Sequence, residues 1–205
     1  MKDTLLGFER HDLDDDHIVW VGHLPDNLVP DAAAFEALWQ THPAEYHEIK
    51  MYGRLVKTPR WQQAYGKDYR YTGRVNKAEP IPALLEPLLS WSQENIDQNL
   101  NGLLLNWYDG LLGHYIGPHS DSIVHLVPAT PIVTISLGDK RFFRLRRGPA
   151  KLKAPPIDFP VRNGSVIVLP WKTNLAFTHE VPHHVRQLRR RISVTLRGFI
   201  NQTTN

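Results

Sequence analysis

Hydrophobic residues follow a helical spacing in two stretches of the first half of the chain. Residues 30–40 begin at Pro30-Asp31 and place Leu38 and Trp39 among their apolar positions. Residues 80–98 carry a longer apolar stripe at nearly helical spacing, with Pro80 and Pro82 at its start and a kink predicted at Pro87. We therefore predict two helices here, preceded by a short strand at 18–21.

From Gly102 onward the pattern changes to short β-branched and apolar runs separated by turns. Asp109-Gly110, Gly138-Asp139 and Asn163-Gly164 supply turn residues between them. Several strands at this rhythm favour a jelly-roll double sheet. The predicted strands are 103–108, 132–137, 142–146, 165–169 and 191–200.

These patterns predict an α+β chain that is mainly β and forms one domain over residues 1–205. A jelly-roll catalytic core occupies residues 102–200, and the N-terminal helices lie behind its sheet. Residues 1–16 are polar, and we expect a loosely ordered lead-in there.

Composition narrows the class of protein and the kinds of site it can have. Hydrophobic residues make up 41% and charged residues 22%, ordinary values for a globular domain. The sequence shows neither a membrane-length apolar run nor a signal peptide, so we expect an intracellular monomer without membrane contact. The chain has no cysteine, so a metal site must use histidine and carboxylate ligands.

Net charge is +3 and the isoelectric point is about 9.2, with the cations gathered in clusters. Such clusters can hold phosphates, but solvated loops that keep the chain in solution have the same appearance. The sequence leaves both interpretations open. The clusters are Arg141, Arg144, Arg146 and Arg147; Lys151 and Lys153; and Arg186, Arg189, Arg190 and Arg191.

His119 and Asp121 stand one residue apart and form the first candidate for chemistry. If both lie on a strand, their side chains share a face, about 6.6 Å apart along the chain. One distant histidine would complete a set of two histidines and one carboxylate, which suits non-haem Fe(II) oxygenases. His-x-Asp alone is weak evidence, because it is common by chance.

Arg191 and Arg197 are six residues apart on a predicted strand, so both guanidinium groups face the same side. Two arginines on an inner strand face require anionic partners, and a dicarboxylate co-substrate would provide them. A solvated edge strand that carries arginine is the alternative. The spacing alone does not decide between the two.

Together, the motifs resemble the AlkB family of Fe(II)- and 2-oxoglutarate-dependent dioxygenases. The likeness covers residues 50–200 and is greatest to the branch that repairs methylated bases in DNA. The motifs, in order, are Met51-Tyr52-Gly53, Pro59-Arg60, Tyr65-Gly66, Tyr71-Thr72-Gly73, Asn106-x-Tyr108, His119-x-Asp121, Ser136-Leu137-Gly138, His179-x-x-Pro182 and Arg191-x₅-Arg197.

The resemblance implies the cofactors and the residues that bind them. Fe(II) would be held by His119, Asp121 and His179, and 2-oxoglutarate and O₂ would be the co-substrates. Arg191 would bind the distal carboxylate of 2-oxoglutarate, while Arg197 would support the end near the metal. Asn106 and Tyr108 correspond to the family's pair that hydrogen-bonds the co-substrate. Oxidation of an N-methyl group would release formaldehyde, succinate and CO₂.

The resemblance also implies a nucleotide-recognition lid over residues 48–73, where aromatic and cationic residues alternate. Tyr52 corresponds to a residue that fills the gap left by a flipped base, and Tyr71 to the aromatic residue that stacks on that base. Arg60 and Tyr65 are further substrate-side candidates. Packing on a core is the alternative for these aromatics.

One position departs from the family pattern. Repair members carry an acidic residue two positions after the metal aspartate, where this chain has Ile123. DNA, possibly duplex, is the expected partner, and 1-methyladenine or 3-methylcytosine the expected lesion. Open alternatives are an oxygenase of this fold acting on RNA, protein or a small molecule, and a non-catalytic nucleic-acid-binding module.

Overall fold

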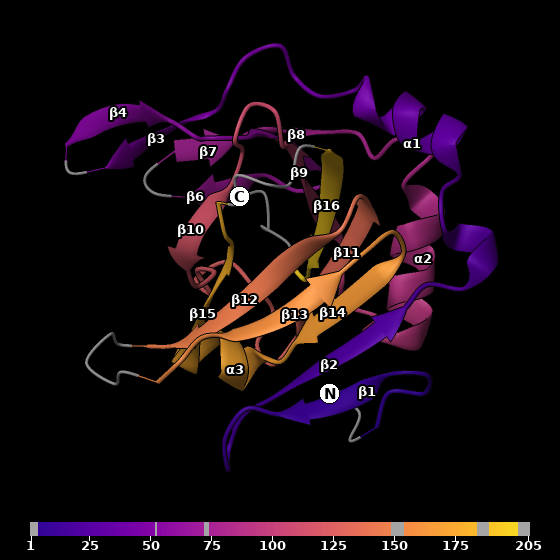
Figure 1. Ribbon diagram of the computed structural model, residues 1–205, viewed down its shortest axis with the longest axis vertical. Helices are drawn as coiled ribbons and strands as arrows, with labels where there is room; N and C mark the ends of the chain where they lie inside the picture. Colours follow the sequence, from indigo (N-terminus) through magenta and orange to yellow (C-terminus); the bar gives the residue numbers. More distant parts are fainter. Residues whose placement is uncertain (1–3, 52, 72–73, 149–153, 184–188, 201–205) are drawn as a thin grey trace.

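Two β-sheets lie face to face in the computed structural model, which describes residues 4–51, 53–71, 74–148, 154–183 and 189–200 (Figure 1). One sheet has eight strands and the other has four. Apolar side chains of both form a shared cluster, with Val19 and Ile167 from the larger sheet and Phe143 and Phe159 from the smaller. This double sheet fits the predicted jelly roll.

The four strands predicted at 103–108, 132–137, 165–169 and 191–200 lie next to one another in the larger sheet. All of its neighbouring strands are antiparallel except β5 and β8, which are parallel. Its order is β1 (Glu9–Asp12), β2 (Ile18–His23), β14 (Ser165–Leu169), β11 (Ile132–Gly138), β16 (Arg190–Arg197), β9 (Gly102–Asp109), β5 (Trp61–Tyr65) and β8 (Ala78–Glu79).

The smaller sheet and two separate hairpins complete the β structure. The hairpins occupy most of the segment predicted as a lid. The smaller sheet has the order β10 (Ile116–His119), β15 (Phe177–Val181), β12 (Arg141–Arg147) and β13 (Ile157–Val161), and the hairpins are β3 (Glu48–Met51) with β4 (Arg54–Lys57) and β6 (Tyr69–Tyr71) with β7 (Arg74–Asn76).

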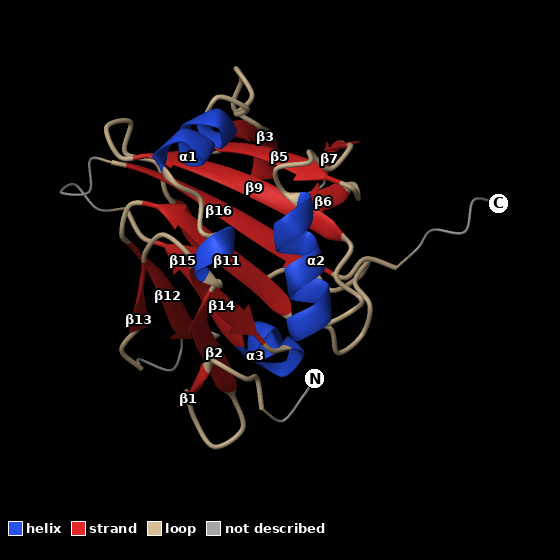
Figure 2. Cartoon of the chain, turned by 90° about the vertical axis from the view of Figure 1, so that its right-hand side faces the viewer, coloured by secondary structure: helices blue, strands red, loops and turns tan. Residues whose placement is uncertain are grey.

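Two helices cover the outer face of the larger sheet, as Figure 2 shows. Their apolar residues, such as Leu38 and Leu88, join the cluster that contains Leu105 and Trp107 of β9. Asp31 begins the first of these helices by accepting a 2.8 Å hydrogen bond from the backbone of Ala34. The helices are η1 (Asp26–Leu28), α1 (Ala32–Trp39), α2 (Glu86–Asn95) and α3 (Trp171–Ala176).

Alternation along β16 separates core residues from residues of the inner face. Ile192, Val194 and Leu196 pack into the cluster beneath the helices. The alternate residues, from Arg191 to Arg197, line a pocket on the opposite face. The prediction that these two arginines share one inner face is therefore confirmed.

Two details of the predicted fold were wrong. Residues 9–12 of the expected loose lead-in form β1, which pairs with β2; its sequence Glu-Arg-His-Asp is wholly polar and so shows no apolar alternation. Pro87 does not kink the second helix, because that helix begins at Glu86 and Pro87 lies in its first turn. Proline is tolerated there, since the first helical N–H groups have no partner within the helix.

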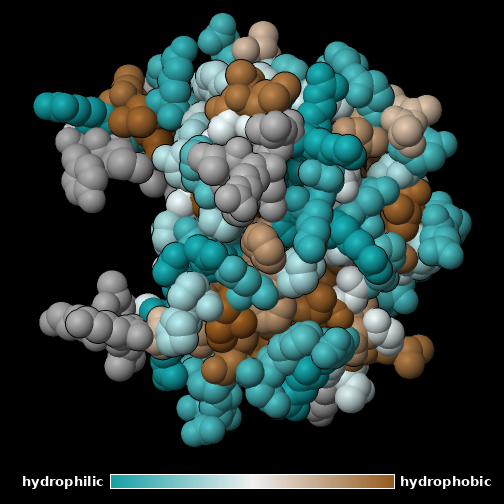
Figure 3. Space-filling view, in the orientation of Figure 1, coloured by the Kyte–Doolittle hydropathy of each residue, from teal (hydrophilic) through white to brown (hydrophobic). Residues whose placement is uncertain are grey.

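The β3–β4 hairpin projects from the body at the upper left of Figure 1, and apolar and polar atoms alternate on it in Figure 3. Leu55 and Val56 on β4 are 59% and 42% exposed, between exposed Arg54 and Lys57. No helix among the described residues is long and apolar enough to cross a membrane.

Candidate metal centre and its pocket

Three side chains converge at one end of the pocket between the sheets. His119 is the last residue of β10 and lies directly opposite His179 of β15. Asp121 follows on an irregular segment, so it does not share a strand with His119 as the one-residue spacing suggested. Ligand atoms of the three residues nevertheless all lie within 4.8 Å of one another.

Both imidazoles are in the protonation state that a metal requires. The His119 Nδ1 lies 2.9 Å from the carbonyl oxygen of Gly117, so Nδ1 carries the proton and Nε2 keeps its lone pair. Burial lowers the pKa of His119. Burial and the nearby His119 ring lower the pKa of His179 to about 3. Both rings are therefore neutral at physiological pH.

Arg197 and Tyr69 hold the carboxylate of Asp121. Burial alone would raise the pKa of this carboxyl, but the Arg197 guanidinium keeps it well below its usual range. Arg197 donates from Nε to Oδ2 at 2.7 Å, and its Nη2 lies 2.7 Å from the same oxygen in an ion pair. The Tyr69 hydroxyl donates to Oδ1 at 3.2 Å, and the Arg197 guanidinium lies 4.6 Å from the centre of the Tyr69 ring.

This donor set fits a divalent transition metal such as Fe(II). Two neutral imidazoles and one carboxylate provide three ligands and leave other positions open for oxygen donors. His179 Nδ1 is buried and makes no hydrogen bond within the described structure. A buried ring nitrogen without a partner is costly, and a metal bound at this nitrogen would satisfy it.

The opposite end of the pocket is built to receive an anion. Arg191 is fully buried, and its Nε and Nη2 donate to the Ser136 hydroxyl at 3.2 and 2.7 Å. Its Nη1 has no hydrogen-bond partner among the described atoms. Burial lowers the pKa of Arg191 to about 10, and its guanidinium lies 5.3 Å from the centre of the Tyr108 ring. A carboxylate would satisfy this cation.

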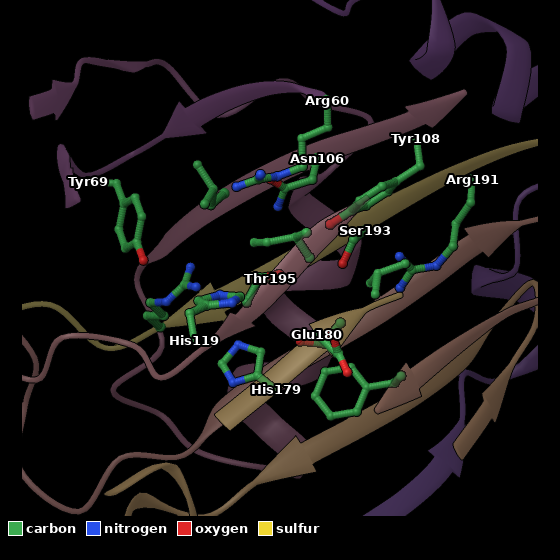
Figure 4. Close-up of a pocket in the computed structure, with 16 residues that line it drawn as sticks. Arg60, Tyr69, Asn106, Tyr108, His119, His179, Glu180, Arg191, Ser193 and Thr195 are labelled. Atoms are coloured by element: carbon green, nitrogen blue, oxygen red, sulfur yellow. The ribbon is translucent and has the colours of Figure 1, made fainter. Parts of the chain in front are cut away.

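The wall between the two ends presents hydrogen-bond donors, as Figure 4 shows. Arg60 donates from Nε to the Asn106 Oδ1 at 2.7 Å and from Nη2 to Gln62 at 3.0 Å. An arginine can only donate, so the Asn106 oxygen must face it, and the Asn106 NH₂ group is left to donate elsewhere. The Ser193 and Thr195 hydroxyls also line the wall. Such a surface suits a ligand rich in oxygen acceptors.

The match to a known family agrees with this geometry. Residues 32–197 match the model of the 2OG-Fe(II) oxygenase superfamily. The chain belongs to this superfamily. The family is that of Fe(II)- and 2-oxoglutarate-dependent oxygenases, and the described residues include a candidate His-Asp-His metal site.

Its relatives are of the AlkB type. The human protein named DNA oxidative demethylase ALKBH2 is 27% identical over 160 residues, which cover 74% of this chain and 61% of the human protein. A rat protein named alpha-ketoglutarate-dependent dioxygenase alkB homolog 3 is 28% identical over 153 residues, which cover 68% of this chain and 50% of that protein. This chain thus spans less than two thirds of either relative.

A solved structure gives independent support for the fold. The structure of OsALKBH1 superposes with a TM-score of 0.57 at 13% sequence identity, covering 92% of this chain and 99% of that chain. The jelly-roll architecture is therefore shared where little of the sequence is.

The substrate-side predictions have mixed outcomes within this superfamily fold. Arg60 lines the pocket. Tyr65 does not, because it is 3% exposed and packs in the main apolar cluster beside Leu103. Tyr71 lies on β6, but its side chain is outside the described part of the structure, as is the whole of Tyr52.

Ile123 lies half-buried on the segment after Asp121 and is not among the residues that line the pocket. The cationic clusters are largely neutralised where the structure describes them. Arg144 pairs with Asp158, Arg146 with Glu180, and Arg147 with Asp14, while Arg190 pairs with Glu36 and the remaining buried arginines face the interior.

Sequence reasoning missed several residues that support the site. Tyr69 lies within the predicted lid but was given no role there, and its bond to Asp121 depends on the β6–β7 hairpin reaching the pocket. Ser136 was recognised as part of a motif but not as the partner of Arg191. Asn174 on α3 bonds the backbone of Asp121, and no spacing in the sequence marks it.

Proposed function

We propose that this chain oxidatively demethylates N-alkylated bases in DNA, such as 1-methyladenine and 3-methylcytosine, using Fe(II), 2-oxoglutarate and O₂. The observation that carries the oxygenase chemistry is one pocket lined by His119 and His179 of the metal triad at one end and by the buried, incompletely paired Arg191 at the other. Support for DNA as substrate comes from the relatives, since proteins named DNA oxidative demethylase ALKBH2 occur in human, mouse and cattle.

In this proposal the pocket residues divide between metal and co-substrate. His119, Asp121 and His179 hold the metal, and Arg197 keeps Asp121 ionised and in place. Arg191, which lines the same pocket as His119 and His179, binds the distal carboxylate of 2-oxoglutarate. The NH₂ group of Asn106, oriented by Arg60, and the Tyr108 hydroxyl donate to co-substrate oxygens.

Bound Fe(II) and 2-oxoglutarate supply the oxidising chemistry, with succinate and CO₂ as co-products. The protein's part is to place the N-methyl group beside the metal and to exclude water from the pocket. A hydroxylated N-methyl group then leaves as formaldehyde and restores the base. Oxidation is thus confined to a methyl group that reaches the end of the pocket near His119.

The two hairpins are the proposed lid that receives the nucleotide. Tyr69 of β6 both lines the pocket and bonds Asp121, which connects one hairpin directly to the metal centre. Exposed Lys50, Arg54 and Lys57 on the other hairpin can hold phosphates. We propose that Tyr52 fills the gap in the duplex and that Tyr71 stacks on the flipped base.

Ile123 bears on which methylated base the protein prefers. An apolar residue here removes a hydrogen-bond acceptor for an exocyclic amine. Preference among 1-methyladenine, 3-methylcytosine and other lesions can shift as a result, and RNA remains the alternative nucleic acid.

The test is mass spectrometry of methylated oligonucleotides incubated with the protein, Fe(II), ascorbate and 2-oxoglutarate. The panel holds 1-methyladenine and 3-methylcytosine in single-stranded and duplex DNA and in RNA, with Asp121→Ala as the inactive control. Loss of one methyl mass with the wild-type protein alone establishes demethylation and ranks the substrates. Succinate formation without any methyl loss would exclude these bases and direct the search to protein or small-molecule substrates.

A further inference from the structure

Asp121 is the metal ligand with the least regular backbone. His119 and His179 are fixed by strand pairing, whereas Asp121 lies beyond the end of β10, in a segment with no ladder hydrogen bonds of its own. Arg197 and Tyr69 hold its carboxylate but not its main chain. A separate contact must therefore fix the position from which this carboxylate reaches the metal.

Asn174 makes that contact. The Asp121 N–H donates to the Asn174 Oδ1 at 2.9 Å, and the Asn174 Nδ2 donates to the Asp121 carbonyl oxygen at 3.0 Å. Asn174 is 1% exposed, and Asp121 is 4% exposed. The two bonds close a ring between one side-chain amide and both polar backbone groups of the ligand residue, which restrains its rotation as well as its position.

We propose that Asn174 is a positioning residue for the metal centre, and that the α3–β15 unit thereby sets two of the three ligands. Asn174 lies on α3 and His179 lies five residues further along, on β15. A single short segment thus supplies one ligand directly and fixes a second through its backbone. This inference rests on the metal site assigned above and requires no particular substrate.

If Asn174 had only a structural role, its replacement would lower stability without changing metal binding. Buried amides need hydrogen-bond partners wherever they occur, so loss of Asn174 lowers stability in either case. The adjacent Thr173 on α3 provides the comparison, because it is also 1% exposed. Its hydroxyl donates instead to the backbone carbonyl oxygen of Ile18 on β2, at 2.7 Å. Removal of that bond weakens the helix without affecting Asp121.

The experiment is titration of the full-length, metal-stripped protein with Co(II), followed by visible absorption and calorimetry. The variants are Asn174→Ala, Asn174→Asp and Thr173→Val. Supporting groups around metal ligands are typically worth 10- to 100-fold in affinity, and we expect a weakening of about that size for Asn174→Ala, with altered Co(II) bands. Thr173→Val should lower the melting temperature and leave both the affinity and the bands unchanged.

Asn174→Asp keeps the test decisive if the alanine variant does not fold. Aspartate has nearly the same shape and still accepts from the Asp121 N–H, but it cannot donate to the carbonyl oxygen, so weaker Co(II) binding is expected here too. Co(II) affinity and bands equal to those of the wild type in the folded Asn174 variants would overturn the proposal and leave Asn174 a purely structural residue.

Failure of this inference can be distinguished from failure of the proposed function. If the wild-type protein does not bind Co(II), or if Asp121→Ala binds it equally well, the metal site is wrong and the role of Asn174 falls with it. If Co(II) binds and the Asn174 variants weaken it, but no methylated base is altered, the role of Asn174 stands and only the substrate is wrong.

Discussion

Two buried arginines of one strand have opposite effects on the protein before any ligand binds. Arg197 is paired with Asp121 through two 2.7 Å contacts, so its charge is compensated. Arg191 donates to the Ser136 hydroxyl and lies beside the Tyr108 ring, but its Nη1 has no hydrogen-bond partner among the described residues. A buried cation without an anion is destabilising, so the ligand-free protein carries a cost that a bound carboxylate would relieve.

Replacement of Arg191 by methionine should therefore separate stability from binding. We expect Arg191→Met to raise the free energy of unfolding of the ligand-free protein by about 1 kcal/mol, because an apolar chain replaces an uncompensated charge. The same change should weaken 2-oxoglutarate binding at least about 30-fold, since loss of one partner of a buried charge pair costs about 2–5 kcal/mol. Denaturant unfolding of the ligand-free protein measures the first effect. Calorimetry of 2-oxoglutarate binding with Mn(II) present measures the second.

The control for this prediction is Arg144→Met, which removes an arginine that pairs with Asp158 and does not itself line the pocket. It should leave 2-oxoglutarate affinity unchanged. Unchanged affinity in Arg191→Met would mean that the distal carboxylate binds elsewhere.

A buried histidine outside the pocket predicts acid sensitivity. His114 is 3% exposed; its Nδ1 accepts from the backbone of Asp109 at 3.1 Å and its Nε2 lies 2.9 Å from the Tyr46 hydroxyl. Burial lowers the pKa of His114 below its usual value near 6.5. As the pH falls, the unfolded chain therefore binds a proton at this histidine before the folded protein does. His114 thus leaves the free energy of unfolding unchanged above about pH 6.5 and lowers it below that pH, by at most about 1.4 kcal/mol per pH unit.

His114→Asn should reduce that acid sensitivity. We expect a lower melting temperature at pH 7.5, because the ring contacts are lost, but a smaller further drop between pH 7.5 and 5.5. Thermal unfolding across this range is the measurement, and His125→Asn, which changes an exposed ring, is the control. An identical pH slope in His114→Asn and wild type would contradict the assignment.

At the scale of elements, the sequence predicts the strands that are rich in apolar residues and buried along nearly their whole length, and it misses more exposed strands such as β1 and β10. β9, β11, β14 and β16 were predicted because apolar residues repeat along them. β10 was missed because Ile-Gly-Pro-His shows neither alternation nor β-branched richness, and β1 because all four of its residues are polar. The six-residue α3 is too short for a helical period to appear.

The turn between β11 and β12 was predicted from Gly138-Asp139, and the structure shows why glycine is needed. Gly138 has φ +87°, and a Cβ built there would lie 2.7 Å from the carbonyl oxygen of Arg190. Gly138→Ala should therefore lower the free energy of unfolding by about 1–3 kcal/mol, through backbone strain and displacement of β16. Chemical denaturation measures the change.

Gly148→Ala is the matched comparison, because a Cβ there would meet only the Ala176 carbonyl oxygen at 3.8 Å. Its effect should stay within about 0.5 kcal/mol. An equally small effect of Gly138→Ala would show that the hairpin tolerates another turn.

At the scale of the whole molecule, the site depends on both sheets at once. The four-stranded sheet supplies His119 and His179, and the eight-stranded sheet supplies Arg191 and Arg197. These four residues could be identified from the sequence, because each belongs to a motif with a fixed spacing along the chain. Such motifs could not identify Tyr69 or Asn174, whose partner Asp121 is 52 and 53 residues away, because only the fold brings them together.

His119, Asp121 and His179 come from the four-stranded sheet and the segment that follows β10, and Arg197 of the eight-stranded sheet pairs with Asp121. A metal held by these three residues requires the folded state and should therefore stabilise the fold. A ligand that binds only the folded state adds about 2.7 kcal/mol at one hundred times its dissociation constant. We expect Mn(II) to raise the melting temperature of the wild-type protein by several degrees, and EDTA to reverse this.

Asp121→Asn distinguishes metal binding at this site from general cation binding. The substitution keeps the shape of the side chain but removes the charge that Arg197 faces, so the metal-free variant should unfold at a lower temperature than wild type. Because the carboxylate ligand is also lost, Mn(II) should no longer raise its melting temperature. If Mn(II) stabilised wild type and Asp121→Asn equally, the metal would be binding elsewhere.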